Sequence, residues 1–354
     1  MKRCKKCGRE GFSSAKPCEC GNFAAPGADR NKAATILTAL AGAAAILGIV
    51  EMTSRMIFGL GSPVLFEVDP NFGSYPRPNQ RLHRFFVDID TNQYGMRSSP
   101  FAPKKQADEY RILFVGDSVP FGTTYIDQRD IFVEQIDLRL RQKKNVRAVI
   151  MNASSPGWAP SNELGFIKTR GLYDADLVVL VYNTKDLTQQ FSAYRDSPIT
   201  PLANPRFAIS ELWLRYVIPR LFPQLAVVDP GSTAAQGKPR LSDEALVMET
   251  IERTKEFVAS KGARFVILYS PVFTDDVRSY QSDWDEALAR LKRWGIQEGV
   301  PIIDMTNSVS RNSARVYVDG IHLRKAGNGL YADTFMNWFN VHELTAAGNA
   351  GSHK

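Results

Sequence analysis

Five short apolar runs, each followed by a segment with helical spacing, most strongly constrain how this chain folds. The runs lie at 111–116, 146–152, 175–183, 264–270 and 300–305, and the helical patterns fall near 130–142, 161–171, 243–261, 283–298 and 326–341. Runs that are apolar throughout are typical of strands in a parallel sheet covered on both faces. The pattern therefore predicts a three-layer α/β/α domain over 110–345, with flavodoxin-like strand order and a ligand crevice at the carboxyl ends of the strands.

Two other segments lie outside this alternation of strand and helix patterns. Residues 65–109 are rich in Pro, Asn, Asp and Arg and show little periodicity, which predicts an irregular connecting segment laid over the main domain. Residues 190–240 form a long insertion that contains the amphipathic piece SELWLRYVIPRLF. We expect this insertion to form the acceptor or lid side of the cleft.

An uncharged apolar run at 33–50 precedes the domain. As a helix its 18 residues would extend for about 27 Å, close to the thickness of one hydrocarbon core. A buried core helix would show polar positions at helical spacing, and a signal peptide would not usually follow a 32-residue segment that contains a cysteine cluster. The run therefore predicts a retained transmembrane helix, with an interfacial end that extends to residue 58.

The formal charge of +7 is concentrated before this run. Residues 1–32 carry eight basic and three acidic residues, or +5, which leaves only +2 for the rest of the chain. Within about 20 residues after the run Arg55 is the only basic residue. The positive-inside rule then predicts a cytoplasmic N-terminus and an extracytoplasmic (periplasmic) body. A near-neutral body also argues against a nucleic-acid partner.

All four cysteines lie in the first 22 residues, as a Cys-x-x-Cys pair (Cys4, Cys7) and a tighter Cys-x-Cys pair (Cys18, Cys20). Each pair stands beside a glycine, as in the knuckles of a small zinc ribbon. In a reducing cytoplasm metal binding is favoured over disulfides. These cysteines are therefore predicted to bind a structural zinc ion in a tail that is also a candidate site for a cytoplasmic protein partner. The alternative is a redox-inert or disulfide-linked tail.

Three residues indicate hydrolytic chemistry. Ser118 directly follows the first strand in FVGDSVPFG, although a serine there is also a candidate for a simple helix cap. Asp319 and His322 are three residues apart just before the last helix, and the other three histidines lack such a partner. A nucleophilic serine needs a base to take its proton and a carboxylate to orient that base. The sequence predicts a triad of Ser118, His322 and Asp319.

Taken together, these blocks resemble the SGNH hydrolases, the GDSL-like lipases and esterases, over roughly residues 92–340. The resemblance extends to NASSPGW with Gly157 after the second strand, to VYNTKDL after the third, and to a lead-in at 91–99 similar to that of bacterial membrane-anchored members. It implies an oxyanion hole formed by the backbone N–H groups of Ser118 and Gly157 plus an asparagine side chain. It implies no cofactor for catalysis.

The third block departs from the Gly-x-Asn-Asp pattern of the family. Aligning Asp186 with the aspartate places Lys185 at the asparagine and Asn183 at the glycine. We expect Asn183 to be the side-chain donor, because its amide is neutral and it shares a strand face with Lys185 if the strand continues that far. Lys185 is the alternative.

The combined features predict a membrane-anchored serine esterase or acyltransferase. Its substrates would be O-acyl esters, acetyl above all, of an extracytoplasmic glycan or lipid-linked saccharide. The alternative is a non-catalytic membrane-spanning sensor or scaffold with a glycan-binding body and a zinc-binding tail. Lys185 favours the scaffold, whereas the intact triad favours the enzyme.

Overall fold

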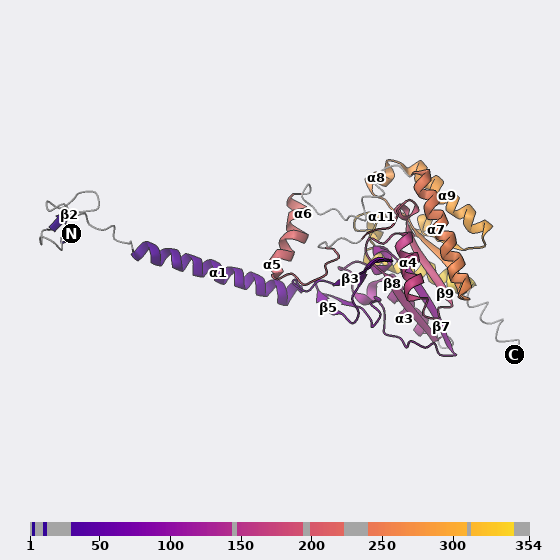
Figure 1. Ribbon diagram of the computed structural model, residues 1–354, viewed down its shortest axis with the longest axis horizontal. Coiled ribbons are helices and arrows are strands. Elements are labelled where there is room, and N and C mark those ends of the chain that lie inside the picture. Colours follow the sequence, from indigo (N-terminus) through magenta and orange to yellow (C-terminus); the bar gives the residue numbers. More distant parts are fainter. Residues whose placement is uncertain are drawn as a thin grey trace. The chain divides into compact units, whose positions relative to one another are not determined.

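The computed structural model describes residues 2–3, 10–12, 30–143, 147–193, 199–222, 240–309 and 313–342. The chain divides into two compact units, Met1–Thr53 and Ser54–Lys354. Figure 1 shows the chain coloured by sequence, from indigo at the N-terminus to yellow at the C-terminus.

The first unit contains a short hairpin and most of a long helix. Strands β1 (Lys2–Arg3) and β2 (Glu10–Phe12) pair antiparallel, and helix α1 extends over Arg30–Phe58. Within the described ranges one helical stretch, Lys32–Phe58, is long and apolar enough to cross a membrane, a test that a signal sequence near an N-terminus also passes. The four cysteines of the predicted zinc site lie outside the described residues.

A five-stranded parallel sheet forms the centre of the second unit and confirms the predicted fold class. The strands lie in the order β11-β10-β9-β7-β8, which is the flavodoxin-like order. Every residue of β9, the middle strand, is buried, which explains why the strand is apolar up to its last residue, Asn183. The strand bounds are β7 Glu109–Gly116, β8 Arg147–Ser154, β9 Leu177–Asn183, β10 Arg264–Ser270 and β11 Ile302–Asp304.

Helices cover both faces of this sheet. The longer ones are α3 (Phe132–Arg141), α4 (Pro160–Arg170), α7 (Leu241–Ser260), α9 (Gln281–Gln297) and α12 (Lys325–His342). Single turns are α2 (Ser118–Phe121), α5 (Ala208–Glu211), α6 (Ile218–Leu221), α8 (Asp275–Arg278), α10 (Thr306–Val309) and α11 (Ser313–Val316). Two 3₁₀ turns, η1 (Gln128–Asp130) and η2 (Thr184–Leu187), and a π-helical segment, η3 (Leu212–Val217), complete the list.

Two buried clusters, one on each side of the sheet, give the domain its three layers. Along β7, Leu113 and Val115 pack with α4, α7 and α9, whereas Ile112 and Phe114 pack with α3 and α12. Side chains alternate between the two faces of a strand, so a continuously apolar strand serves both clusters. Figure 1 labels α4, α7 and α9 of the first set and α3 of the second.

The segment 65–109 differs from the expected irregular connection, because it contains two hairpins. Strands β3 (Phe66–Asp69) and β4 (Gly73–Pro76) pair antiparallel, as do β5 (Arg81–Arg84) and β6 (Val87–Asp90). Each strand has only four residues, which is close to the shortest run that predicts a strand. FEVD and VDID alternate apolar with polar residues, whereas RLHR and the fully buried GSYP do not.

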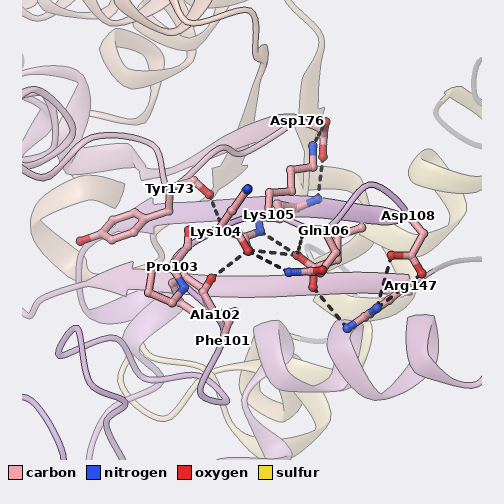
Figure 2. A network of polar contacts seen from close by, with 12 residues as sticks. Phe101, Ala102, Pro103, Lys104, Lys105, Gln106, Asp108, Arg147, Tyr173 and Asp176 are labelled. Carbon is pink, nitrogen blue, oxygen red and sulfur yellow. Dashed lines mark hydrogen bonds and ion pairs between the residues drawn. The ribbon is translucent and has the colours of Figure 1, made fainter.

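After the second hairpin, a buried arginine near the start of β7, Arg111, holds the loop 101–108 against the sheet. The Arg111 guanidinium donates hydrogen bonds to the carbonyl oxygens of Ala102 (2.8 Å) and Tyr173 (2.9 Å) and pairs with Glu109 (2.9 Å). Lys105 forms an ion pair with Asp176 in the same network, which Figure 2 shows around the loop 101–108. These contacts hold the amino end of the sheet, opposite the edge where the predicted site residues lie.

Residues 199–222 of the insertion pack against the second hairpin. Glu211 forms a buried ion pair with Arg84 and accepts a hydrogen bond of 2.7 Å from the backbone N–H of Gly61. Arg215 donates a hydrogen bond of 3.2 Å to the hydroxyl of Thr124, in the loop that follows α2. The predicted amphipathic piece is therefore helical and touches a loop next to Ser118.

Candidate active site

A tight turn presents Ser118 at the carboxyl end of β7. Gly116 ends the strand, and a Cβ there would lie 2.7 Å from Cγ of Pro120 and 2.9 Å from the carbonyl oxygen of Val181, so the turn requires glycine. The cap of α2 is Asp117, whose Oδ1 accepts a hydrogen bond of 2.8 Å from the backbone N–H of Val119. Because Asp117 takes the capping role, the hydroxyl of Ser118 is available for another partner.

The second half of the site is a turn before α12. Tyr317 and Leu323 form an antiparallel bridge, and the backbone N–H of Val318 donates to the carbonyl oxygen of His322 at 2.8 Å. At the tip Gly320 has a φ of +89°, and its carbonyl oxygen accepts a hydrogen bond of 2.9 Å from the backbone N–H of Phe273. The turn is thus anchored to the loop after β10, on the same edge of the sheet as Ser118.

The structure brings the three predicted triad residues into one hydrogen-bonded chain. Oγ of Ser118 lies 2.9 Å from Nε2 of His322, and Nδ1 of His322 lies 2.7 Å from Oδ2 of Asp319. Oδ1 of Asp319 accepts hydrogen bonds from the backbone N–H groups of His322 (2.9 Å) and Ile321 (3.1 Å). Partial burial opposes ionisation of Asp319, but these hydrogen bonds and the nearby imidazole lower its pKa to about 2. Asp319 is therefore a carboxylate at neutral pH.

Asn183 is buried and linked to the residue before Ser118. Its side-chain N–H₂ donates a hydrogen bond of 2.9 Å to Oδ2 of Asp117, and its Oδ1 accepts one of 2.7 Å from the backbone N–H of Lys185. Its own backbone N–H donates to Oδ2 of Asp186 at 2.7 Å. An amide N–H₂ has two hydrogens, and the bond to Asp117 uses one of them.

Lys185 does not lie on a strand face, which corrects one premise of the sequence interpretation. β9 ends at Asn183, and Lys185 belongs to the 3₁₀ turn η2. Its Nζ forms an ion pair of 2.8 Å with Asp276 of α8 rather than with the neighbouring Asp186. The change from extended strand to 3₁₀ turn removes the two-residue periodicity that would have aligned Lys185 with Asn183.

Gly157 lies in the turn after β8, the strand that neighbours β7. It has a φ of +80°, a backbone conformation that favours glycine. The turn is tied to the Ser118 turn by a hydrogen bond of 3.2 Å from the backbone N–H of Ser155 to the carbonyl oxygen of Gly116. Trp158, which follows, is buried and donates to the carbonyl oxygen of Ser74 at 2.7 Å. Gly157, Ser118 and Asn183 thus lie at the carboxyl ends of adjacent strands.

Sequence reasoning missed Arg97, which holds the loop after α2. This buried guanidinium donates to the carbonyl oxygens of Phe121 (2.7 Å), Thr123 and Ile126 (2.6 Å), and to the side chain of Gln128 (3.1 Å). Burial lowers the pKa of Arg97 to about 10, which leaves it charged at neutral pH. The sequence signal that could have identified Arg97 was its position in the lead-in at 91–99. A single arginine in a polar segment, however, does not indicate which carbonyl oxygens it binds.

A group of buried carboxyls behind Ser118 was also missed. Asp117, Glu163 of α4 and Asp186 are all buried, and burial raises the pKa of each. The effect is large for Glu163 and Asp186; the charge of Asp117 adds to it in both, and that of Asp186 adds to it in Glu163. For Asp117 the hydrogen bonds from Val119 and Asn183 oppose the effect of burial.

Within the ranges described, no group of three or more His, Cys, Asp or Glu side chains is arranged to hold a metal ion. The predicted zinc ligands are not among the residues described, so that prediction stays open.

Comparisons with known proteins give similarities to solved structures only. No protein-family model and no curated protein matches the chain. It is similar to a lipolytic protein of the G-D-S-L family from Veillonella parvula (TM-score 0.43, 16% identity, 65% of this chain and 98% of that one). It is also similar to a putative acylhydrolase from Bacteroides fragilis (TM-score 0.41, 15% identity, 67% and 90%) and to an acetylxylan esterase from Geobacillus stearothermophilus (TM-score 0.40, 13% identity, 67% and 95%).

Proposed function

We propose that this chain is a serine hydrolase of the SGNH type, in which Ser118 is the nucleophile, His322 the base and Asp319 the residue that orients the base. The observation that carries the proposal is the hydrogen-bonded chain from Oγ of Ser118 through both ring nitrogens of His322 to the Asp319 carboxylate. Residues 204 positions apart meet in this chain at the carboxyl edge of a parallel sheet, where open α/β folds place their sites.

The reaction follows from the order of these groups. When Oγ of Ser118 attacks the ester carbonyl carbon, its proton passes to Nε2 of His322, and the C–O bond to the alcohol then breaks as that proton moves to the leaving oxygen. The acyl group remains on Ser118. Water, or the hydroxyl of an acceptor, then attacks the acyl carbon while His322 takes its proton. The bond between that carbon and Oγ of Ser118 breaks, and His322 returns the proton to Oγ. Asp319 accepts the Nδ1 hydrogen bond throughout and stabilises the imidazolium that forms.

The proposed oxyanion hole consists of the backbone N–H groups of Ser118 and Gly157 and the second N–H of the Asn183 amide. Their positions at the carboxyl ends of the adjacent strands β7, β8 and β9 support this assignment. Asn183 is favoured over Lys185 because the Lys185 ammonium is engaged with Asp276. Preorganised donors of this kind are worth about 3 kcal/mol each in other hydrolases.

For the substrate, we propose an O-acyl ester, acetyl above all, on an extracytoplasmic glycan or lipid-linked saccharide. The location is supported by the apolar helix Lys32–Phe58 together with the basic segment before it. In the cytoplasmic tail Cys4, Cys7, Cys18 and Cys20 would bind one structural zinc ion, which metal analysis of the full chain tests. Catalysis itself would need no metal.

The scaffold alternative loses the feature that favoured it. Lys185 departs from the family pattern, but its ion pair with Asp276 gives it a structural role that is compatible with an active enzyme. A purely glycan-binding body would have no use for the alignment of Ser118, His322 and Asp319.

Labelling with a fluorophosphonate probe separates the two functions. In an active hydrolase Oγ of Ser118 forms a bond to phosphorus, fluoride leaves, and the serine proton passes to His322. The full chain should be labelled, and the Ser118→Ala variant should not. Absence of labelling in the folded wild-type protein would refute the hydrolase, and equal labelling of the variant would show that another residue reacts.

A further inference from the structure

The second unit carries exposed apolar side chains around the point where α1 ends. In the last turn of α1 Met56, Ile57 and Phe58 are exposed. The Phe58 ring contacts the rings of Phe85 and Phe86, with centroids 6.1 Å and 6.3 Å apart, and Phe86 is 69% exposed. The hairpin β5–β6 therefore extends the apolar surface of the helix end.

The insertion continues this surface. The Tyr216 ring lies 5.1 Å from that of Phe85, which joins η3 to the hairpin. Trp213 (50% exposed), Leu214 (55%) and Leu221 (63%) are exposed on the helical segment that contains the buried Glu211. Figure 1 shows α5 and α6 standing away from the helices α7 and α9 that cover the sheet. We call this set the helix-exit patch: Met56, Ile57, Phe58, Phe86, Phe207, Trp213, Leu214, Leu221 and Phe222.

Basic groups border the patch. Arg206 and Arg220 are exposed, and the Arg206 guanidinium lies over the Phe207 ring at 5.7 Å. Glu211, an acidic residue of the same segment, is buried in its ion pair with Arg84 and is not presented to solvent. Aromatic and aliphatic side chains with arginines beside them are the composition of helices that lie in the headgroup region of a bilayer.

The length of α1 also indicates that the helix-exit patch lies in the headgroup region of the bilayer. The apolar stretch Lys32–Phe58 has 27 residues, whereas a hydrocarbon core takes about 20. A helix that spans the membrane would therefore place its last residues, and the rings they contact, at the lipid–water interface.

We infer that the helix-exit patch inserts into the outer surface of the bilayer next to the anchoring helix, with Trp213 and Leu214 among the acyl chains near the headgroups. This inference rests on the membrane-anchored part of the proposed function. It adds a second attachment, which limits rotation of the domain about its anchor. Arg215 links the same segment to Thr124 beside α2. The entrance of the site would thereby be held close to acyl esters that are carried at the membrane surface.

Tryptophan quenching by brominated lipid tests the inference on the full chain. The apolar helix contains no tryptophan, so quenching reports on the second unit. The full chain is reconstituted into vesicles of phosphatidylcholine or of its brominated form. We expect brominated lipid to reduce the emission of the wild type, and Trp213→Phe to lose most of that reduction. Trp294→Phe is the matched control, because Trp294 lies on α9 and its indole donates to Glu252; this variant should keep the quenching.

Three outcomes would overturn the inference. Equal quenching of the wild type and Trp213→Phe would place another tryptophan in the lipid. Absence of quenching in all three proteins would leave the patch in water. Quenching that disappears as the protein-to-lipid ratio rises would show that a second copy of the chain covers the patch. Fluorophosphonate labelling of the same samples is independent: labelled protein without quenching contradicts only the membrane surface, and quenched protein without labelling contradicts only the hydrolase.

Discussion

Asn183 donates a side-chain hydrogen bond of 2.9 Å to Asp117, the residue immediately before Ser118. The end of β9 and the turn after β7 are therefore joined by a buried amide–carboxylate contact. Since Asp117 also caps α2, this contact fixes the helix on which Ser118 is the first residue.

Replacing Asn183 by alanine should affect both activity and stability. It removes the proposed oxyanion donor, so kcat for a small acetyl ester should fall roughly 10²-fold with little change in KM. It also leaves the Asp117 carboxylate buried with one donor fewer, which should lower the free energy of unfolding by about 1–3 kcal/mol. Lys185→Ala is the control and should cost under about 1 kcal/mol, because its ion pair with Asp276 is partly exposed. The reverse ranking in kcat would assign the donor to Lys185.

Ser118→Ala should abolish turnover of a small acetyl ester, with a loss of roughly 10³-fold or more, while the thermal midpoint stays close to that of the wild type. His322→Ala should lose about as much, because the serine and its base act as one unit. Asp319→Asn should retain more activity than either variant. Steady-state kinetics on the three purified variants measures the order, and full activity of Ser118→Ala would refute the mechanism.

Arg97→Lys should reduce both stability and kcat. A lysine keeps the charge but cannot supply the forked donors that reach the carbonyl oxygens of Phe121 and Ile126. We expect a loss of about 2–3 kcal/mol in unfolding free energy, because these acceptors stay buried. Arg129→Lys is the control, since the Arg129 side chain is 80% exposed and should tolerate the change. Identical unfolding curves for the two variants would show that Arg97 is not needed to hold the loop.

Glu134→Gln should change how stability depends on pH. Burial, with the nearby Asp137 adding to its effect, raises the pKa of Glu134 to about 7. The unfolded state therefore releases this proton at lower pH than the folded state, so the wild type loses stability as the pH rises from about 4.5 to about 7. Glutamine carries no such proton, and the variant should gain relative to the wild type over this range, by roughly 2–3 kcal/mol at pH 8. Unfolding measured at pH 5 and pH 8 tests the sign, and parallel curves would contradict it.

A reporter enzyme fused after Lys354 should be active only outside the cytoplasm, because the basic residues precede the apolar helix. Activity in the cytoplasm would overturn the topology and with it the extracytoplasmic substrate. Release of the fusion without its N-terminal tail would instead indicate that the helix is cleaved as a signal sequence.

The fold and the local half of the site could be derived from the sequence alone. Continuous apolar runs alternating with helical patterns determined the parallel sheet, because burial of both faces favours apolar residues in a strand such as β9 up to its last residue, Asn183. The pairing of Asp319 with His322 was equally accessible, since three residues of turn bring the carboxylate to the imidazole.

Tertiary structure alone decided the contacts between distant loops. The partner of Lys185 is Asp276 of α8, and the acceptors of Arg97 are carbonyl oxygens of the loop after α2. The spacing of residues along the chain indicates which side chains share a face of a helix or strand and which can meet across a short turn. The partner of a polar side chain in a loop depends instead on which distant loops the strand order brings close to it. From the sequence alone, Asn183 was compared only with its sequence neighbour Lys185. In the structure Asn183 binds Asp117 instead, because β9 lies beside β7 in the sheet.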